Sequence, residues 1–382
     1  MLDTAQINLV LGFAVGEIEA VGMYSASSFD LQRYATNSAG GLPLSVSRAG
    51  LVVLTVAFAV ARLGGISFPI ELQAGSYLFG MVALNLPHGG FEHFENLRRR
   101  LSTFQVRYVA LYLALVGSFA GLFFIAPVAG LALAIAVAVA KGGLGDLQVL
   151  KALGATAHLQ TRPQRWLAAA VRGGAVMLVP VVFFTETFYE FSSLMVGLFD
   201  EGALAAVAVG PETARLFAGS AFGLLLVAHL LLGALRAPGT GAYRTDVFET
   251  LLLTVYFAVV PVVVAVGLYF PLWYSARQVA RTNATEDDVF TDRGDFAGLL
   301  SPLDSEDSTR IALSAWGLLV AGSVLTFGLA AGLWLGMPNP PTSGPLLPGL
   351  VAFWSIFISI IALPHIVVGT WLDRDRGIWY VP

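Results

Sequence analysis

The chain has 382 residues and a formal net charge of −4, and 57% of its residues are hydrophobic while only 12% are charged. Soluble globular domains contain about 25% charged residues, so this composition excludes a soluble protein and indicates one that crosses a membrane several times. Because the chain has no cysteine, disulfides, iron–sulfur clusters and thiolate metal sites are excluded, and any metal would need histidine, carboxylate or tyrosine ligands.

Residues 1–48 are expected to form a separate N-terminal segment. The apolar run from Ile7 to Tyr24 has no basic start and carries Glu17 and Glu19, which argues against a cleaved signal peptide. We expect a short amphipathic or weakly spanning helix there. Few lysines and many arginines, together with abundant Ala, Val and Gly, indicate a salt-adapted, haloarchaeal source.

The rest of the chain, 49–382, is expected to be a transmembrane helical bundle. A span needs ~20 apolar residues, and irregular backbone cannot face lipid. The pattern predicts an all-α polytopic membrane protein of about eight to ten transmembrane helices. The clear candidate spans are 49–68, 69–87, 107–125, 127–145, 167–185, 214–235, 311–336 and 346–371.

The run 248–276 is long for one helix and contains Pro261. We expect the helix to break near Pro261 into two short arms that return to the same face, although an ordinary proline kink is an alternative. The break would leave only Arg62 and Arg215 near the other face, where we expect loops at 126–127, 186–213, 261 and 337–345. The acidic residues Glu186, Glu190, Asp200 and Glu201 are expected to form a solvated face of the loop 186–213. By the positive-inside rule the arginine-rich loops and the C terminus are then cytoplasmic. The basic residues placed on that face are Arg98 to Arg100, Lys151, Arg162, Arg165, Arg236, Arg244, Arg277, Arg281, Arg293, Arg374 and Arg376.

The segment 282–310 is rich in aspartate and glutamate. We interpret it as a solvated acidic hairpin or disordered insert, because the ligand spacing of an EF-hand is absent.

Four short stretches place polar residues at the ends of apolar runs, where ionisable side chains are functional candidates. The stretches are Pro87-His88-Gly89-Gly90-Phe91-Glu92-His93, Lys141-Gly142-Gly143-Leu144-Gly145-Asp146, Tyr269 to Arg281 with Trp273-Tyr274-Ser275-Ala276-Arg277-Gln278, and Leu363-Pro364-His365. Their order resembles that of the Brp/Blh family, whose motifs read Pro-His-Gly-x-x-Asp, His-Phe-Gly-x-x-Asp, His-Ser-x-Arg-His and a final Pro-His. The resemblance runs from about residue 80 to the C terminus.

The resemblance implies an activity and a metal. Family members are membrane β-carotene 15,15'-dioxygenases that make retinal, and their Fe(II) is thought to be held by one histidine of the first motif, one of the second and two of the third. Here His88 is kept, while Lys141, Tyr274 and Gln278 stand at the other positions. A charged ammonium has no lone pair for a metal. We therefore expect a divergent member without native-type iron. His88 is a candidate metal ligand, and His93 is a candidate replacement for one of the lost histidine ligands.

Lys141 admits three interpretations. It could form a buried ion pair with Glu92 or Asp146, with Glu249 near the same face, and so replace the metal charge. It could extend its ammonium to the headgroups. It could also form a Schiff base with retinal, because a desolvated amine is a nucleophile toward aldehydes.

Other side chains are candidates for the ligand site or for the core. A carotenoid tunnel would use the aromatic residues of the broken segment, Tyr256, Tyr269, Phe270 and Trp273. His365 keeps the last family position, although a core histidine bonded to a backbone carbonyl is the alternative. Of the remaining histidines, His229 is expected to be a structural hydrogen bonder and His158 to be solvated in a polar loop.

These patterns give a first hypothesis for function. It is a Brp/Blh-like cell-membrane protein that binds a carotenoid or retinal without iron catalysis, in contact with lipid and with a retinal protein as a further partner. One alternative is an active β-carotene 15,15'-dioxygenase with Fe(II) in a rearranged site, and another is a transporter or permease. No nucleic-acid partner is expected.

Overall fold

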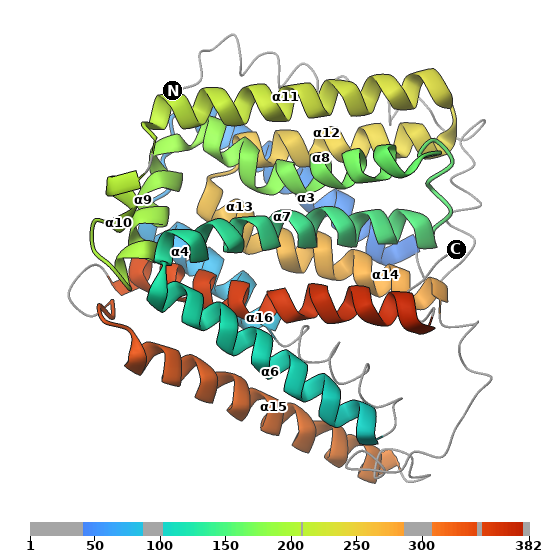
Figure 1. Cartoon of the computed structure of the whole chain (residues 1–382). Coiled ribbons are helices and arrows are strands. Elements are labelled where there is room, and N and C mark those ends of the chain that lie inside the picture. The colour runs from blue at the N-terminus through green and yellow to red at the C-terminus, as the bar shows by residue number, and fades with distance from the viewer. Residues whose placement is uncertain (1–40, 87–101, 208, 286–307, 342–345, 377–382) are drawn as a thin grey trace.

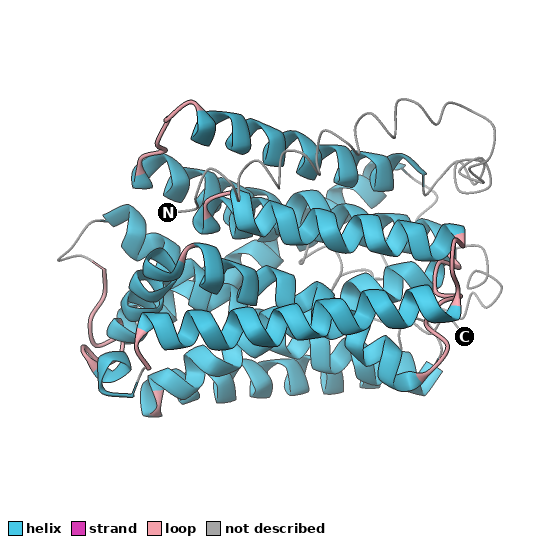
Figure 2. Cartoon of the chain, turned by 90° about the horizontal axis from the view of Figure 1, so that it is seen from above, coloured by secondary structure: helices cyan, strands magenta, loops and turns pink. Residues whose placement is uncertain are grey.

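The computed structural model describes residues 41–86, 102–207, 209–285, 308–341 and 346–376. These residues form a helical bundle in which no strand is present, and most helix axes run roughly side by side (Figure 1, Figure 2). In chain order the elements are α3 (Gly41–Leu63), α4 (Ile70–Leu78), η1 (Phe79–Asn85), α6 (Ser102–Ile125), α7 (Pro127–Ala152), α8 (Arg162–Phe183), α9 (Thr185–Gly197), α10 (Ala203–Val207), α11 (Pro211–Arg236), α12 (Gly241–Val259), α13 (Val262–Tyr269), η2 (Phe270–Ser275), α14 (Ala276–Thr285), α15 (Ser308–Gly336) and α16 (Leu346–Arg376).

Five of these helices are long and apolar enough to cross a membrane: α3, α7, α8, α11 and, over Leu346–Val367, α16. Shorter apolar stretches occupy the C-terminal parts of α6 and α15. The predicted all-α polytopic membrane bundle is confirmed, and the total of eight to ten spans stays a prediction.

Some boundaries differ from those expected. Helix α3 begins at Gly41, so the expected boundary at residue 48 falls inside it. The prediction of a loop at 186–213 is wrong, because α9 and α10 lie there. The expected helix at Ile7–Tyr24 and most of the acidic segment lie outside the described residues.

The break at Pro261 is confirmed. Helix α12 ends at Val259, Val260 is extended (φ −77°, ψ 131°), and Pro261 is the N-cap of α13. Proline lacks the N–H that would continue the helix, and the Tyr256 hydroxyl bridges the break by donating to the Ala265 carbonyl at 3.0 Å. The chain turns there, so that α13, η2 and α14 run back toward the end of the bundle where α12 begins (Figure 1), and α14 packs against α3 and α7.

Two π-helical stretches face each other inside the bundle. The stretch η1 continues α4, and η2 joins α13 to α14. Pro271, within η2, removes a backbone donor and so favours the wider turn. The Ser275 hydroxyl donates to Asn85 Oδ1 at 3.5 Å, which links the two stretches.

Helices α7 and α8 pack with their backbones almost in contact. A Cβ added at Gly143 would overlap the Ala169 carbonyl oxygen, and one added at Gly173 would overlap the Val139 carbonyl oxygen. Small residues permit this approach in membrane bundles, where close packing drives helix association.

The buried apolar side chains form two main clusters. One gathers α8, α12, α13 and η2 around Tyr256, Phe257 and Trp273. The other joins α6, α7 and α16 around Phe123 and Phe357. These two clusters make up most of the apolar core of the described residues.

Candidate functional site

An apolar cavity lies between α4–η1, α7, α9, α13–η2 and α16. The cavity, counted together with the part that opens to the outside, has about 980 Å³ of empty space. In the described part of the chain, Lys141 is the only charged side chain on its wall. Apolar walls with few polar groups are typical of small-molecule sites. The other lining residues are Tyr77, Met81, Asn85, Leu131, Ala134, Ile135, Val137, Ala138, Met177, Phe188, Phe191, Ser192, Met195, Val262, Val263, Val266, Phe270, Val351, Ser355, Ile358, Ser359 and Ala362.

The amine of Lys141 lies over two aromatic rings. Its Nζ is 5.6 Å from the centre of the Phe270 ring and 5.0 Å from that of Tyr274. Aromatic faces attract a cation within about 6 Å. The broken segment therefore supplies a platform for the amine of α7.

Three of the motif positions meet where α7 contacts η2 and α14. Lys141 contacts Tyr274, and Gln278 Nε2 donates to the Gly145 carbonyl at 3.3 Å. Asn85, three residues before His88, lies on the same cavity wall as Lys141. His88, Glu92 and His93 lie outside the described residues.

The aromatic ligand candidates occupy different places. Phe270 lines the cavity. Tyr256 and Tyr269 are buried in the core, and Trp273 is buried with its indole against the Arg277 guanidinium, 4.6 Å from the ring centre. On α16 the wall ends at Ala362, so His365 lies three residues beyond it and is partly buried.

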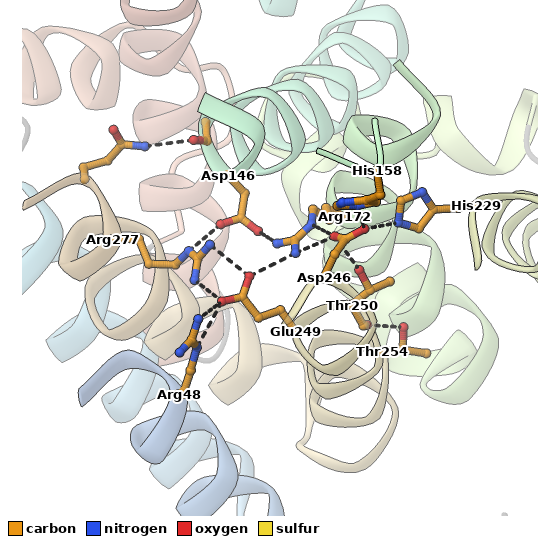
Figure 3. A network of polar contacts seen from close by, with 12 residues as sticks. Arg48, Asp146, His158, Arg172, His229, Asp246, Glu249, Thr250, Thr254 and Arg277 are labelled. Atoms are coloured by element: carbon orange, nitrogen blue, oxygen red, sulfur yellow. Dashed lines mark hydrogen bonds and ion pairs between the residues drawn. The ribbon is translucent and has the colours of Figure 1, made fainter. Parts of the chain in front are cut away.

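Behind the platform lies a buried ion network, formed by Arg48, Asp146, His158, Arg172, His229, Asp246, Glu249 and Arg277 (Figure 3). Arg172 of α8 is fully buried at its centre. Its Nη1 donates to Asp146, its Nη2 to Asp246 Oδ1 at 2.8 Å and to Glu249 Oε2 at 3.0 Å. One guanidinium thus holds carboxylates from α7 and α12.

Arg277 of α14 makes the second junction. Its Nε donates to Asp146 Oδ1 at 2.5 Å, while Nη1 and Nη2 donate to the two oxygens of Glu249 at 2.7 and 3.0 Å. Arg48 of α3 donates from Nη2 to Glu249 Oε1 at 2.7 Å. The three arginines balance the three carboxylates, as buried charges require.

Two histidines complete the network at Asp246. His158 Nε2 lies 2.7 Å from Asp246 Oδ2 and bonds to it. His229 Nε2 is 2.8 Å from the same oxygen, but its geometry falls short of a hydrogen bond. His158 has no exposed surface, so the expectation that it is solvated is wrong. His229 is buried beside Asp246, and its expected role as a structural hydrogen bonder stays a prediction.

Sequence reasoning missed most of this network. Asp146, considered as a partner for Lys141, gives both of its carboxylate oxygens to Arg172 and Arg277. The available signal was Arg172 itself, a charge in the middle of an apolar run, which is unusual in a span unless it is paired. Its partners could not be read from the sequence, because they come from helices far apart in the chain.

The motif side chains described by the structure do not fit an iron site. A charged lysine offers no lone pair, and the amide N–H of Gln278 is directed to the Gly145 carbonyl. Among the described residues no group of three or more histidines and carboxylates is arranged to hold a metal.

Comparisons with known proteins give one consistent result. The family model described as "Beta-carotene 15,15'-dioxygenase" matches residues 79–373. A protein of Halobacterium salinarum strain R1, named "Probable beta-carotene 15,15'-dioxygenase Brp", is 59% identical over 360 residues, which cover 94% of this chain and all of that protein. The "Probable beta-carotene 15,15'-dioxygenase Blh" of strain NRC-1 is 34% identical over 343 residues, covering 87% of this chain and 95% of that protein. No solved structure matches.

Proposed function

The chain belongs to the β-carotene 15,15'-dioxygenase family, and from this premise we propose that it binds a carotenoid or retinal in the apolar cavity without the family's iron chemistry. The observation that carries the proposal is the apolar cavity whose only charged wall residue, in the described part of the chain, is Lys141. A long apolar isoprenoid suits these walls. Lys141 stands where the resemblance implies an iron-binding histidine.

The second candidate function is cleavage of β-carotene with O2 by an iron site arranged differently. The relative that is 59% identical favours it, because its name is that of a probable dioxygenase. Such a site would need ligands from outside the described residues, such as His88 and His93. Bound Fe(II) would supply the oxygen chemistry.

We expect the purified protein to bind a carotenoid or retinal, to contain no stoichiometric iron and to leave β-carotene uncleaved. The reason is that Lys141, Tyr274 and Gln278 stand where the resemblance implies iron-binding histidines, and these three side chains are poor ligands for iron. Metal analysis, the pigment spectrum and chromatography of β-carotene incubations measure all three properties. Iron near one equivalent per chain, lost together with cleavage activity in His88→Ala, would establish the dioxygenase instead.

A matched pair of variants tests whether the cavity holds the pigment. Ala138→Phe fills space on the cavity wall and should remove most of the bound pigment. Leu231→Phe, at an exposed position of α11, adds an aromatic ring away from the cavity and should retain it. Equal pigment content in both variants would place the ligand elsewhere.

The orientation in the cell membrane is part of the proposal. We expect the arginine-rich end, with the start of α8, to be cytoplasmic, and the connection between α9 and α10 to lie outside. Because the chain has no cysteine, single substitutions at the exposed residues Glu201 and Arg162 report the two ends. An impermeant maleimide should label Glu201→Cys in intact cells and Arg162→Cys only after permeabilisation. The reverse pattern would invert the topology.

A retinal protein is the proposed protein partner. Its support is the resemblance, which connects this family to the production of retinal. The apolar cavity would then hold the pigment between its source and that partner.

A further inference from the structure

Lys141 ends an apolar wall of α7. The cavity-lining residues Leu131, Ala134, Ala138 and Lys141 lie on one side of this helix at the three- and four-residue spacing of a helical face. At 1.5 Å per residue, this wall is about 15 Å long. A linear apolar molecule lying along it would bring one end to the amine.

The surroundings of the amine suit a nitrogen that remains cationic after reaction. The Phe270 and Tyr274 rings lie 5.6 and 5.0 Å from Nζ. Their faces stabilise an ammonium, and they stabilise a protonated imine in the same way. Most of the side chains that line the cavity are aliphatic or aromatic, and an amine in an apolar pocket is one of the settings in which lysine reacts with carbonyl compounds.

The buried ion network fixes this arrangement. Asp146 lies five residues after Lys141 on α7, and Arg277 lies three residues after Tyr274. The bond between Asp146 and Arg277 at 2.5 Å therefore holds α7 in register with the broken segment. This register keeps the amine at the aromatic platform and at the end of the cavity.

We propose that Lys141 is a covalent capture site for an apolar polyene aldehyde, which it binds as a reversible imine. The ligand class rests on the proposed function, because retinal, one of the two ligands proposed for the cavity, is an apolar polyene aldehyde. The Lys141 ammonium first loses one proton, and the neutral amine nitrogen attacks the aldehyde carbon and forms a C–N bond. The carbonyl oxygen then leaves as water with the two remaining protons of the nitrogen, and a C=N bond remains. The imine nitrogen takes up one proton again and becomes the cation that the Phe270 and Tyr274 rings stabilise. No oxidant or reductant is consumed.

The chain offers a sharp test, because Lys141 and Lys151 are its only lysines. The purified full-length protein is incubated with all-trans-retinal, reduced with borohydride to convert the imine into a stable amine, and mapped by peptide mass spectrometry. We expect the label on Lys141. Lys141→Arg, which keeps the charge, should lower the total label by about tenfold or more, and the matched control Lys151→Arg should leave it unchanged.

Binding of all-trans-retinol, which has no aldehyde, separates the two proposals. Quenching of tryptophan fluorescence by retinol in both the parent and Lys141→Arg shows that the cavity is intact. Equal borohydride labelling of the parent and Lys141→Arg, or label only on Lys151 or the N terminus, would overturn the capture site while retinol binding upheld the proposed function. Failure of both retinol binding and labelling would overturn both.

Discussion

Arg172→Met should destabilise the protein by about 3–5 kcal/mol and, in a bundle of ordinary stability, prevent its folding. Arg172 has no exposed surface and is bonded to Asp146, Asp246 and Glu249. Without its guanidinium, Asp246 loses the arginine that is bonded to it, and Asp146 and Glu249 each lose one of theirs. Thermal unfolding in detergent, with the yield of folded protein, measures the loss.

Two further variants test whether the loss of stability comes from leaving buried charges unpaired. Arg48→Met removes an arginine whose side chain is 25% exposed. Its partner Glu249 keeps its bonds to Arg277 and Arg172, so this variant should cost about 1 kcal/mol or less. Adding Asp246→Asn to Arg172→Met restores the balance of charge and should recover part of the stability, as a double-mutant cycle would quantify. Equal melting temperatures for the parent and Arg172→Met would show that the network is not needed for stability.

Gly143→Ala should lower the free energy of unfolding by about 1–3 kcal/mol. Alanine usually stabilises a helix interior by up to about 1 kcal/mol relative to glycine, so the expected effect has the opposite sign to the helix propensity. The cause is the new Cβ, which would overlap the Ala169 carbonyl oxygen and push α8 away from α7. Chemical or thermal unfolding of the purified variant checks the prediction.

Gly223→Ala is the matched control for this substitution. Gly223 lies within α11, and a Cβ there would meet nothing within 4 Å. Its stability should be unchanged or higher. An equal loss of unfolding free energy in both glycine variants would show that the close packing of α7 on α8 is not the cause.

The fold was predictable where composition and local geometry decide it. Apolar runs long enough to span a bilayer predicted α3, α7, α8, α11 and α16. Pro261 predicted the break after which the chain runs back to the end of the bundle where α12 begins. The helix α9 was missed, because its acidic residues Glu186 and Glu190 suggested a solvated loop. The apolar side chains Phe188, Phe191 and Met195 of the same helix form part of the cavity wall.

The candidate site was only partly predictable. Motif order placed Lys141, Tyr274 and Gln278 on two segments, and the structure brings these segments together. The partners of the buried charges were not predictable, since each arginine had several carboxylates within reach along the chain. The packing of the helices determines which carboxylate each arginine meets. It also buries His158, which the sequence places in a polar loop.

The buried ion network becomes complete only late in the synthesis of the chain. In chain order, α3 carries one arginine of the network, α7 carries one carboxylate and α8 carries a second arginine. Helix α12 carries two carboxylates, and α14 carries the last arginine. A nascent chain that has reached only α8 therefore carries one surplus positive charge among these groups, and one that has reached α12 carries one surplus negative charge. The network has no net charge only after α14 has been added. Because unpaired charges are costly in lipid, the early helices must remain together beside the insertion machinery until α14 has been synthesised.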